Sequence, residues 1–164
     1  MNVVFYLAAA VAVVSTAMVL TRPHAVHALL YLIVSLLAVA VVFFTLGATF
    51  VAALEVIVYA GAIMVLFLFV VMLLNQGPQT MNVAREWLNP AAWVGPAVLA
   101  AILLALLIYG LAAGGMETVG VTTPVPPQAV GASLFGAYLV AVELASMLLL
   151  AALVGAYHLG RRRD

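Results

Sequence analysis

Long runs of apolar residues, separated by short polar segments, dominate the chain. A helix that crosses a bilayer needs about 20 mainly apolar residues. Runs of about this length lie at Val3–Leu20, Ala25–Leu46, Phe50–Leu74, Ala91–Ala113 and Ala132–Leu159. The pattern therefore predicts an all-α integral membrane protein, with five transmembrane helices in a single transmembrane domain that covers residues 1–164.

The two longest segments between these runs differ in character. Gly114–Gln128 carries three prolines, which fix φ and remove backbone donors. Because irregular backbone is not tolerated in contact with lipid, we expect this loop to lie outside the bilayer. The other segment, Asn75–Pro90, is expected to contain a short interfacial turn at Ala84–Leu88.

Composition supports a membrane environment and removes several classes of chemistry. Apolar residues make up 69% of the chain and charged residues only 6%, against about 25% charged in soluble domains. Lipid is therefore the expected surroundings, and no nucleic-acid partner is expected. The absence of cysteine excludes iron–sulfur clusters, cysteine-based zinc sites and covalent c-type haem in this chain. No catalytic constellation or metal-ligand cluster is present in the sequence.

The five arginines predict an orientation. With five spans, the segments that hold Arg22, Arg85 and Arg161–Arg163 all fall on one side of the membrane, and the other side has no basic residue. Because Lys and Arg are enriched in cytoplasmic loops, we predict that the N-terminus lies outside and the C-terminus in the cytoplasm.

Two acidic residues, Glu55 and Glu143, interrupt the apolar runs. At 1.5 Å per residue, Glu55 is expected roughly 7–8 Å and Glu143 roughly 16 Å from the outer ends of their helices. A carboxylate at the centre of a membrane helix costs roughly 2.5–3.5 kcal/mol, and removal from water favours its neutral form. Such residues recur in proton relays, but a permanently protonated glutamate that bonds between helices is the alternative.

The residues after Glu55 leave further alternatives open. Tyr59 lies four positions on, so it shares a helix face with Glu55 and either bonds to the carboxyl group or packs. Gly61 lies between two alanines, which favours close helix contact, although a π-bulge is the other interpretation. Met64 is interpreted as an apolar residue for packing or lipid contact.

Three other kinds of protein fit parts of this pattern. A small stand-alone proton-coupled transporter would use Glu55 and Glu143 as its coupling carboxylates. A haem-bearing anchor would use His24, His27 or His158, although their spacing is not specific for haem. A purely structural membrane subunit would need neither carboxyl group.

Three segments resemble one family of membrane subunits. Leu54–Leu74, LEVIVYAGAIMVLFLFVVMLL, is similar to the third transmembrane helix of subunit J of bacterial complex I, the counterpart of the mitochondrially encoded subunit 6. His27–Leu32, followed by Ser35 and Leu36, resembles the second helix of that family. Val142–Leu150, VELASMLLL, followed by Val154-Gly155-Ala156, resembles its fifth.

This resemblance implies a place in a proton-pumping NADH:quinone oxidoreductase of the bacterial cytoplasmic (inner) membrane. The chain would carry no redox cofactor, and FMN, iron–sulfur clusters and quinone would belong to other subunits. Its neighbours would be the small A and K subunits, the junction subunit with the quinone site, and the antiporter-like subunit N. A π-bulge near Tyr59–Met64 would gate a central water and proton path. The residues that match the path and its gate are Glu55, Tyr59, Gly61, Met64 and Glu143.

Overall fold

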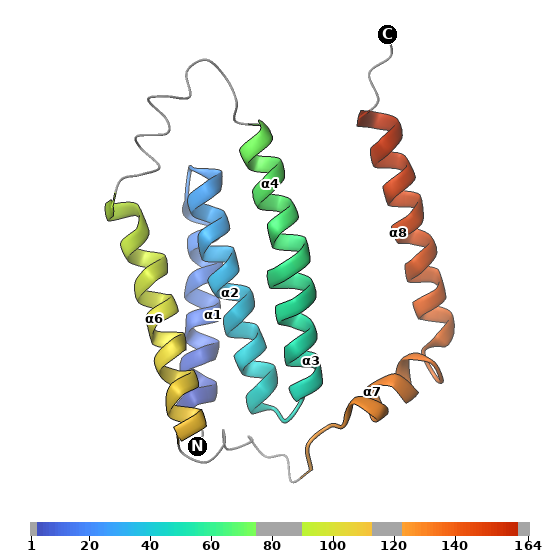
Figure 1. The fold of residues 1–164 in the computed structure, drawn as a ribbon, viewed down its shortest axis with the longest axis horizontal. Helices are drawn as coiled ribbons and strands as arrows, with labels where there is room; N and C mark the ends of the chain where they lie inside the picture. The colour runs from blue at the N-terminus through green and yellow to red at the C-terminus, as the bar shows by residue number, and fades with distance from the viewer. Residues whose placement is uncertain (1–2, 75–89, 113–122, 161–164) are drawn as a thin grey trace. The chain divides into compact units, whose positions relative to one another are not determined.

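The regular structure of the described residues is entirely helical. The computed structural model describes residues 3–74, 90–112 and 123–160, and within them five helices are long and apolar enough to span a membrane (Figure 1). This confirms the predicted all-helical protein with five candidate spans. The chain divides into two units, residues 1–124 and residues 125–164, and each is described by itself.

The first unit begins with an antiparallel pair, α1 (Val3–Thr21) and α2 (Ala25–Thr45). The turn between them contains Pro23, which cannot donate to a helical carbonyl and keeps the preceding residue out of the helical region. At its other end α2 stops at Gly47, whose φ is 78°. The N–H groups of Gly47 and Ala48 donate to the carbonyls of Phe44 and Phe43, an arrangement that closes many helices.

The third span is built from three consecutive segments: α3 (Thr49–Leu54), the π-helix η1 (Glu55–Ile63) and α4 (Met64–Leu74). The fourth span lies in α6 (Pro90–Ala112). Helix α2 is the centre of this unit, since it contacts α1, α6 and every segment of the third span. The functional candidates on the third span are therefore held in place through α2.

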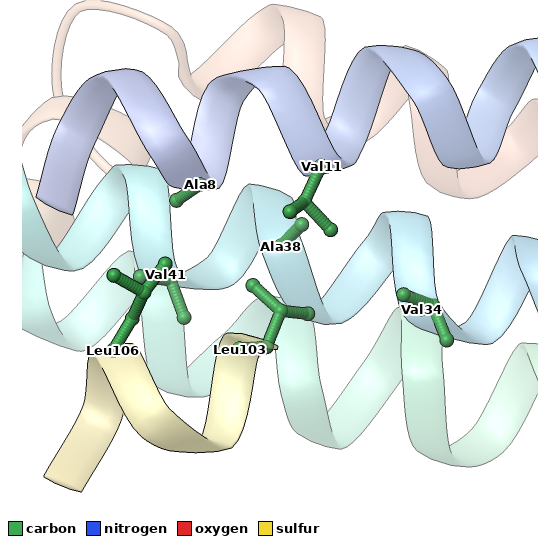
Figure 2. Packing of buried hydrophobic residues seen from close by; sticks show 7 residues of the cluster. All are labelled: Ala8, Val11, Val34, Ala38, Val41, Leu103 and Leu106. Atoms are coloured by element: carbon green, nitrogen blue, oxygen red, sulfur yellow. The ribbon is translucent and has the colours of Figure 1, made fainter. Parts of the chain in front are cut away.

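The core of the first unit lies where α1, α2 and α6 meet, and Figure 2 shows its side chains pointing toward one another. Ala8 of α1 and Ala38 of α2 have no exposed surface, because small side chains let the two helices approach closely. The larger members fill the remaining space between the three helices; they are Val11, Val34, Val41, Leu103 and Leu106.

The second unit differs from the expected single helix over Ala132–Leu159. It contains α7 (Pro127–Leu134), a turn over residues 135–138, and α8 (Leu139–Gly160). Gly136 lies in that turn, and a Cβ there would come within 2.5 Å of the carbonyl oxygen of Ala132. Glycine permits this close backbone approach, so the chain leaves the helix at a point where its residues are still apolar.

Two of the expected features fall outside the described residues. The interfacial turn at Ala84–Leu88 lies there, as does most of the loop Gly114–Gln128. The described end of that loop, residues 123–126, is not helical, and Pro127 begins α7. Proline suits this first position because its missing N–H has no helical partner there.

Candidate functional site

The candidate site lies on the third span, where the helix changes its hydrogen-bonding register. From Glu55 to Ile63 the backbone is a π-helix, in which residues five apart are bonded instead of four. At the end of the segment, the N–H of Met64 donates to the carbonyl of Tyr59. The π segment places the expected site residues Glu55, Tyr59 and Gly61 on one irregular stretch, and Met64 directly after it.

Gly61 contributes to this register through its missing side chain. A Cβ at Gly61 would lie 3.2 Å from the carbonyl oxygen of Val56, and no side chain or backbone atom of another helix of the first unit would come within 4 Å of it. Val56 is five residues earlier, so this carbonyl is the partner that a π register gives to residue 61. Of the two interpretations of Gly61, the π irregularity is therefore present, and close contact with another helix is absent among the described residues of the first unit.

Glu55 and Tyr59 lie on a part of the third span that the other described helices of the first unit leave largely open. Glu55 is half-buried, and 51% of the Tyr59 side chain is exposed. Among the described residues, neither the Glu55 carboxyl group nor the Tyr59 hydroxyl makes a hydrogen bond. In a membrane this surface meets either lipid or protein from outside the first unit, and a carboxyl group is costly against lipid.

Met64 occupies the opposite kind of environment. Only 2% of its surface is exposed, and it is among the largest fully buried side chains of the described residues. The residues that follow it on α4 are mostly exposed, among them Val65, Leu66 and Phe67. Met64 therefore anchors the C-terminal end of the π segment in the first unit, which fits its interpretation as a packing residue.

Glu143 belongs to the second unit. It is exposed on α8, and the nearby Ser146 donates its hydroxyl to the backbone carbonyl of Glu143 at 2.7 Å instead of to the carboxyl group. No residue of α8 is buried within the chain. Because α8 begins at Leu139, Glu143 lies only about 6 Å from the start of its helix at 1.5 Å per residue, which is shallower than expected.

The structure also reveals a polar cluster that the sequence analysis did not single out. Ser35 of α2 and Thr16 of α1 share a hydrogen bond of 2.7 Å, and Arg22 donates to the hydroxyl of Tyr31 at 3.3 Å. The rings of His24 and His27 meet edge to face with centroids 5.5 Å apart. The spacing of His27, Tyr31 and Ser35, at four-residue intervals, is the signal in the sequence that predicts their common face.

Comparison with known proteins identifies the family. Residues 15–159 match the model of NADH-ubiquinone/plastoquinone oxidoreductase chain 6. The chain belongs to this family. It is 60% identical over 163 residues to NADH-quinone oxidoreductase subunit J of Pseudomonas aeruginosa, with 99% of this chain and 98% of the relative covered. Against the subunit J of Escherichia coli the identity is 54%, with 98% of this chain and 87% of the relative covered.

A more distant member of the same family, from Buchnera aphidicola of Schizaphis graminum, is 44% identical, with 99% of each chain covered. These matches confirm the resemblance stated from the three helices, and extend it over nearly the whole chain. Together with the five apolar helices, they establish a multi-pass membrane subunit of the complex I chain 6 family.

Proposed function

We propose that this chain is a membrane-arm subunit without a redox centre, which helps to couple quinone reduction to proton translocation in NADH:quinone oxidoreductase. The observation that carries the proposal is the π segment Glu55–Ile63, which holds a carboxyl group and a phenol inside a membrane span. These two groups are the kind that relay protons, and π segments are frequent at functional sites.

The coupling element in this proposal is the register of the third span. A π segment and a regular α-helix differ in which carbonyl each N–H meets, so a change between them rotates one end of the span relative to the other. Because Met64 is buried and Tyr59 is exposed, such a rotation would move the Glu55–Tyr59 part while Met64 stays packed. Quinone reduction would bias this two-state element and so open or close a central water and proton path.

Partners follow from the surfaces that each unit by itself leaves uncovered. Every described residue of α8 is at least partly exposed, and so are most large residues of α4. We propose that the small A and K subunits, the junction subunit with the quinone site, and the antiporter-like subunit N cover these surfaces. FMN, the iron–sulfur clusters and the quinone would be bound by other subunits of the complex.

The proposed location is the bacterial cytoplasmic membrane, with the N-terminus outside and the C-terminus in the cytoplasm. The support is the distribution of arginine, since all five residues of this type fall on one side of a five-span chain. Glu143 is included in the proposed path as a secondary member, because it is the other carboxyl group within an apolar span.

The test compares two conservative variants of the site with a control in the complete complex. Glu55→Gln and Tyr59→Phe remove the titratable groups with little change in shape, and Tyr109→Phe, at a tyrosine that is 65% exposed on α6, is the control. We expect assembly to be normal in all three. Proton pumping and quinone reductase activity should fall in the first two variants and remain at the wild-type level in the control.

Two outcomes would replace this proposal. Unchanged turnover and unchanged proton-to-electron ratio in Glu55→Gln and Tyr59→Phe would indicate a purely structural subunit. Proton-coupled transport by the purified chain alone in liposomes, with no other subunit recovered from detergent-solubilised membranes by a tagged chain, would indicate a stand-alone transporter.

A further inference from the structure

A row of buried polar side chains runs along α2. His27, Tyr31 and Ser35 follow one another at intervals of four residues, so they share one face of the helix. Their exposed fractions are only 9%, 4% and 5%. Ser35 is ten residues beyond the start of α2 at Ala25, which is about 15 Å at 1.5 Å per residue, or half of a hydrocarbon core of about 30 Å. The row therefore reaches from the helix end to the centre of the bilayer.

Helix α1 supplies polar groups that match this row. The Thr16 hydroxyl lies 2.7 Å from that of Ser35, which also reaches the carbonyl of Ala12 at 3.3 Å. One turn closer to the helix end, Arg22 donates to Tyr31 and lies 5.2 Å from the centre of its ring. The contact between α1 and α2 is thus a polar seam along half of its length.

Helix α6 closes the third side of the seam. Gly95 lies against Tyr31 so closely that a Cβ there would overlap the phenol oxygen. The next residue, Pro96, is buried and has no N–H to donate to the carbonyl four residues before it. In membrane helices such carbonyls are satisfied by neighbouring helices or by ordered water.

Two polar atoms in this region have no hydrogen-bond partner: the Oγ of Ser15 and the Nε2 of His27. Ser15 has no exposed surface, so its hydroxyl cannot reach bulk solvent. By contrast, the hydroxyls of Thr16 and Thr21 on the same helix both donate to carbonyls of that helix. Buried polar groups in proteins are almost always bonded, to protein or to ordered water. Two unpartnered atoms beside one polar seam thus indicate a bound polar molecule.

We propose that the seam between α1, α2 and α6 binds internal water molecules at Ser15 Oγ and at His27 Nε2. Water suits both atoms, because it donates and accepts and typically makes about three hydrogen bonds in such sites. A neutral polar molecule suits the Ser15 hydroxyl better than an ion does, because this hydroxyl carries no charge and is fully buried. Water at these two atoms would hydrate the seam at two points, at His27 near the N-terminal end of α2 and at Ser15 on α1. This inference is independent of the proposed function, since it needs only the packing of the three helices.

The direct test is a density map of the complete complex in lipid nanodiscs, at a resolution that shows ordered water. We expect density within hydrogen-bonding distance of both Ser15 Oγ and His27 Nε2. Thr45 is the internal control: it is equally buried, but its hydroxyl already donates to the carbonyl of Val42 at 2.8 Å, so no water should be present there. A map with no water at Ser15, and its hydroxyl turned to the carbonyl of Val11, would overturn the proposal.

A second measurement depends on the sign of a stability change. If water satisfies the hydroxyl of Ser15, Ser15→Ala leaves that water one partner short and should lower the temperature at which the chain dissociates from the purified complex. If the hydroxyl is unsatisfied, the same change removes a costly group and should raise that temperature or leave it unchanged. Thr45→Val is the matched control, because it removes a hydroxyl that its own helix satisfies. A Ser15→Ala complex at least as stable as the wild type contradicts bound water.

Discussion

Gly61 offers the sharpest test of whether the π register matters for function. A Cβ at this position would lie 3.2 Å from the carbonyl oxygen of Val56, which is closer than an ordinary van der Waals contact. In an α register the neighbouring carbonyl would be that of Ile57, at the usual helical distance. A side chain at position 61 therefore presses on the Val56 carbonyl in the π register, and this carbonyl must shift by a few tenths of an ångström to accept it.

The size of this bias follows from the contact. Extra atoms in a tightly packed place cost about 1–3 kcal/mol, and a single methyl with one close contact belongs at the low end. The gain in helix propensity from Gly to Ala, about 1 kcal/mol, applies to both registers and cancels. We therefore expect Gly61→Ala to shift the π-to-α ratio by about 1 kcal/mol, or about fivefold. Gly61→Val, with two more methyl groups, should shift it further.

The assay uses the fully assembled complex. We expect Gly61→Val to assemble normally but to lower both quinone reductase turnover and the number of protons pumped per electron, with Gly61→Ala between it and the wild type. Gly155→Ala is the control, because a Cβ at Gly155 meets no atom within 4 Å beyond its own stretch of α8 in the described second unit. Wild-type turnover and proton-to-electron ratio in assembled Gly61→Val would refute the gating role, even if the register had changed.

Three further results are expected. Gly95→Ala forces a Cβ onto the Tyr31 hydroxyl and should cost about 1–3 kcal/mol of stability. We expect this cost to appear as a lower temperature at which the chain dissociates from the complex. Adding Tyr31→Phe to the same chain should recover part of the loss, and no recovery would contradict the contact. Thr16→Val and Ser35→Ala remove the two ends of the 2.7 Å hydrogen bond. A double-mutant cycle on the stability of the chain should give a coupling energy of about 0.6–1.7 kcal/mol. Strictly additive effects of the two substitutions would speak against the bond. Because the chain has no cysteine of its own, Asn2→Cys should react with a membrane-impermeant thiol reagent added from outside; labelling only after the membrane is opened would reverse the orientation.

The four helices of the first unit could be predicted closely from apolar runs. The helix ends that fall inside the described residues lie within one residue of the ends of these runs, as for Ala25–Leu46 against Ala25–Thr45. The reason is that a proline, a glycine or a polar segment marks each boundary, such as Pro23 before α2 and Gly47 after it. These residues stop a helix by local chemistry, so no knowledge of the neighbouring helices is needed.

The π segment could not be derived from local chemistry alone. Small residues around Gly61 are compatible with close helix packing and with a change of register, and packing is the commoner of the two. The choice depends on whether another helix reaches Gly61, and among the described residues of the first unit none does. The residues left the π-bulge as the less favoured alternative, and the resemblance to the family is what pointed to it more firmly. The polar seam was missed for a related reason, since Ser and Tyr residues in an apolar span carry no charge to draw attention to them.

The start of α8 changes how the two membrane carboxyl groups should be ranked. From the apolar run, Glu143 was expected near the bilayer centre and Glu55 nearer the surface. The break at residues 135–138 moves Glu143 to about 6 Å from the start of α8, whereas Glu55 lies about 9 Å from the start of α3 at Thr49. Helical side chains also lean toward the N-terminal end, which brings the Glu143 carboxyl group closer to the start of α8. Glu55 is deeper, half-buried and next to the π register, and it is therefore the carboxyl group for which neutralisation should have the larger effect on pumping.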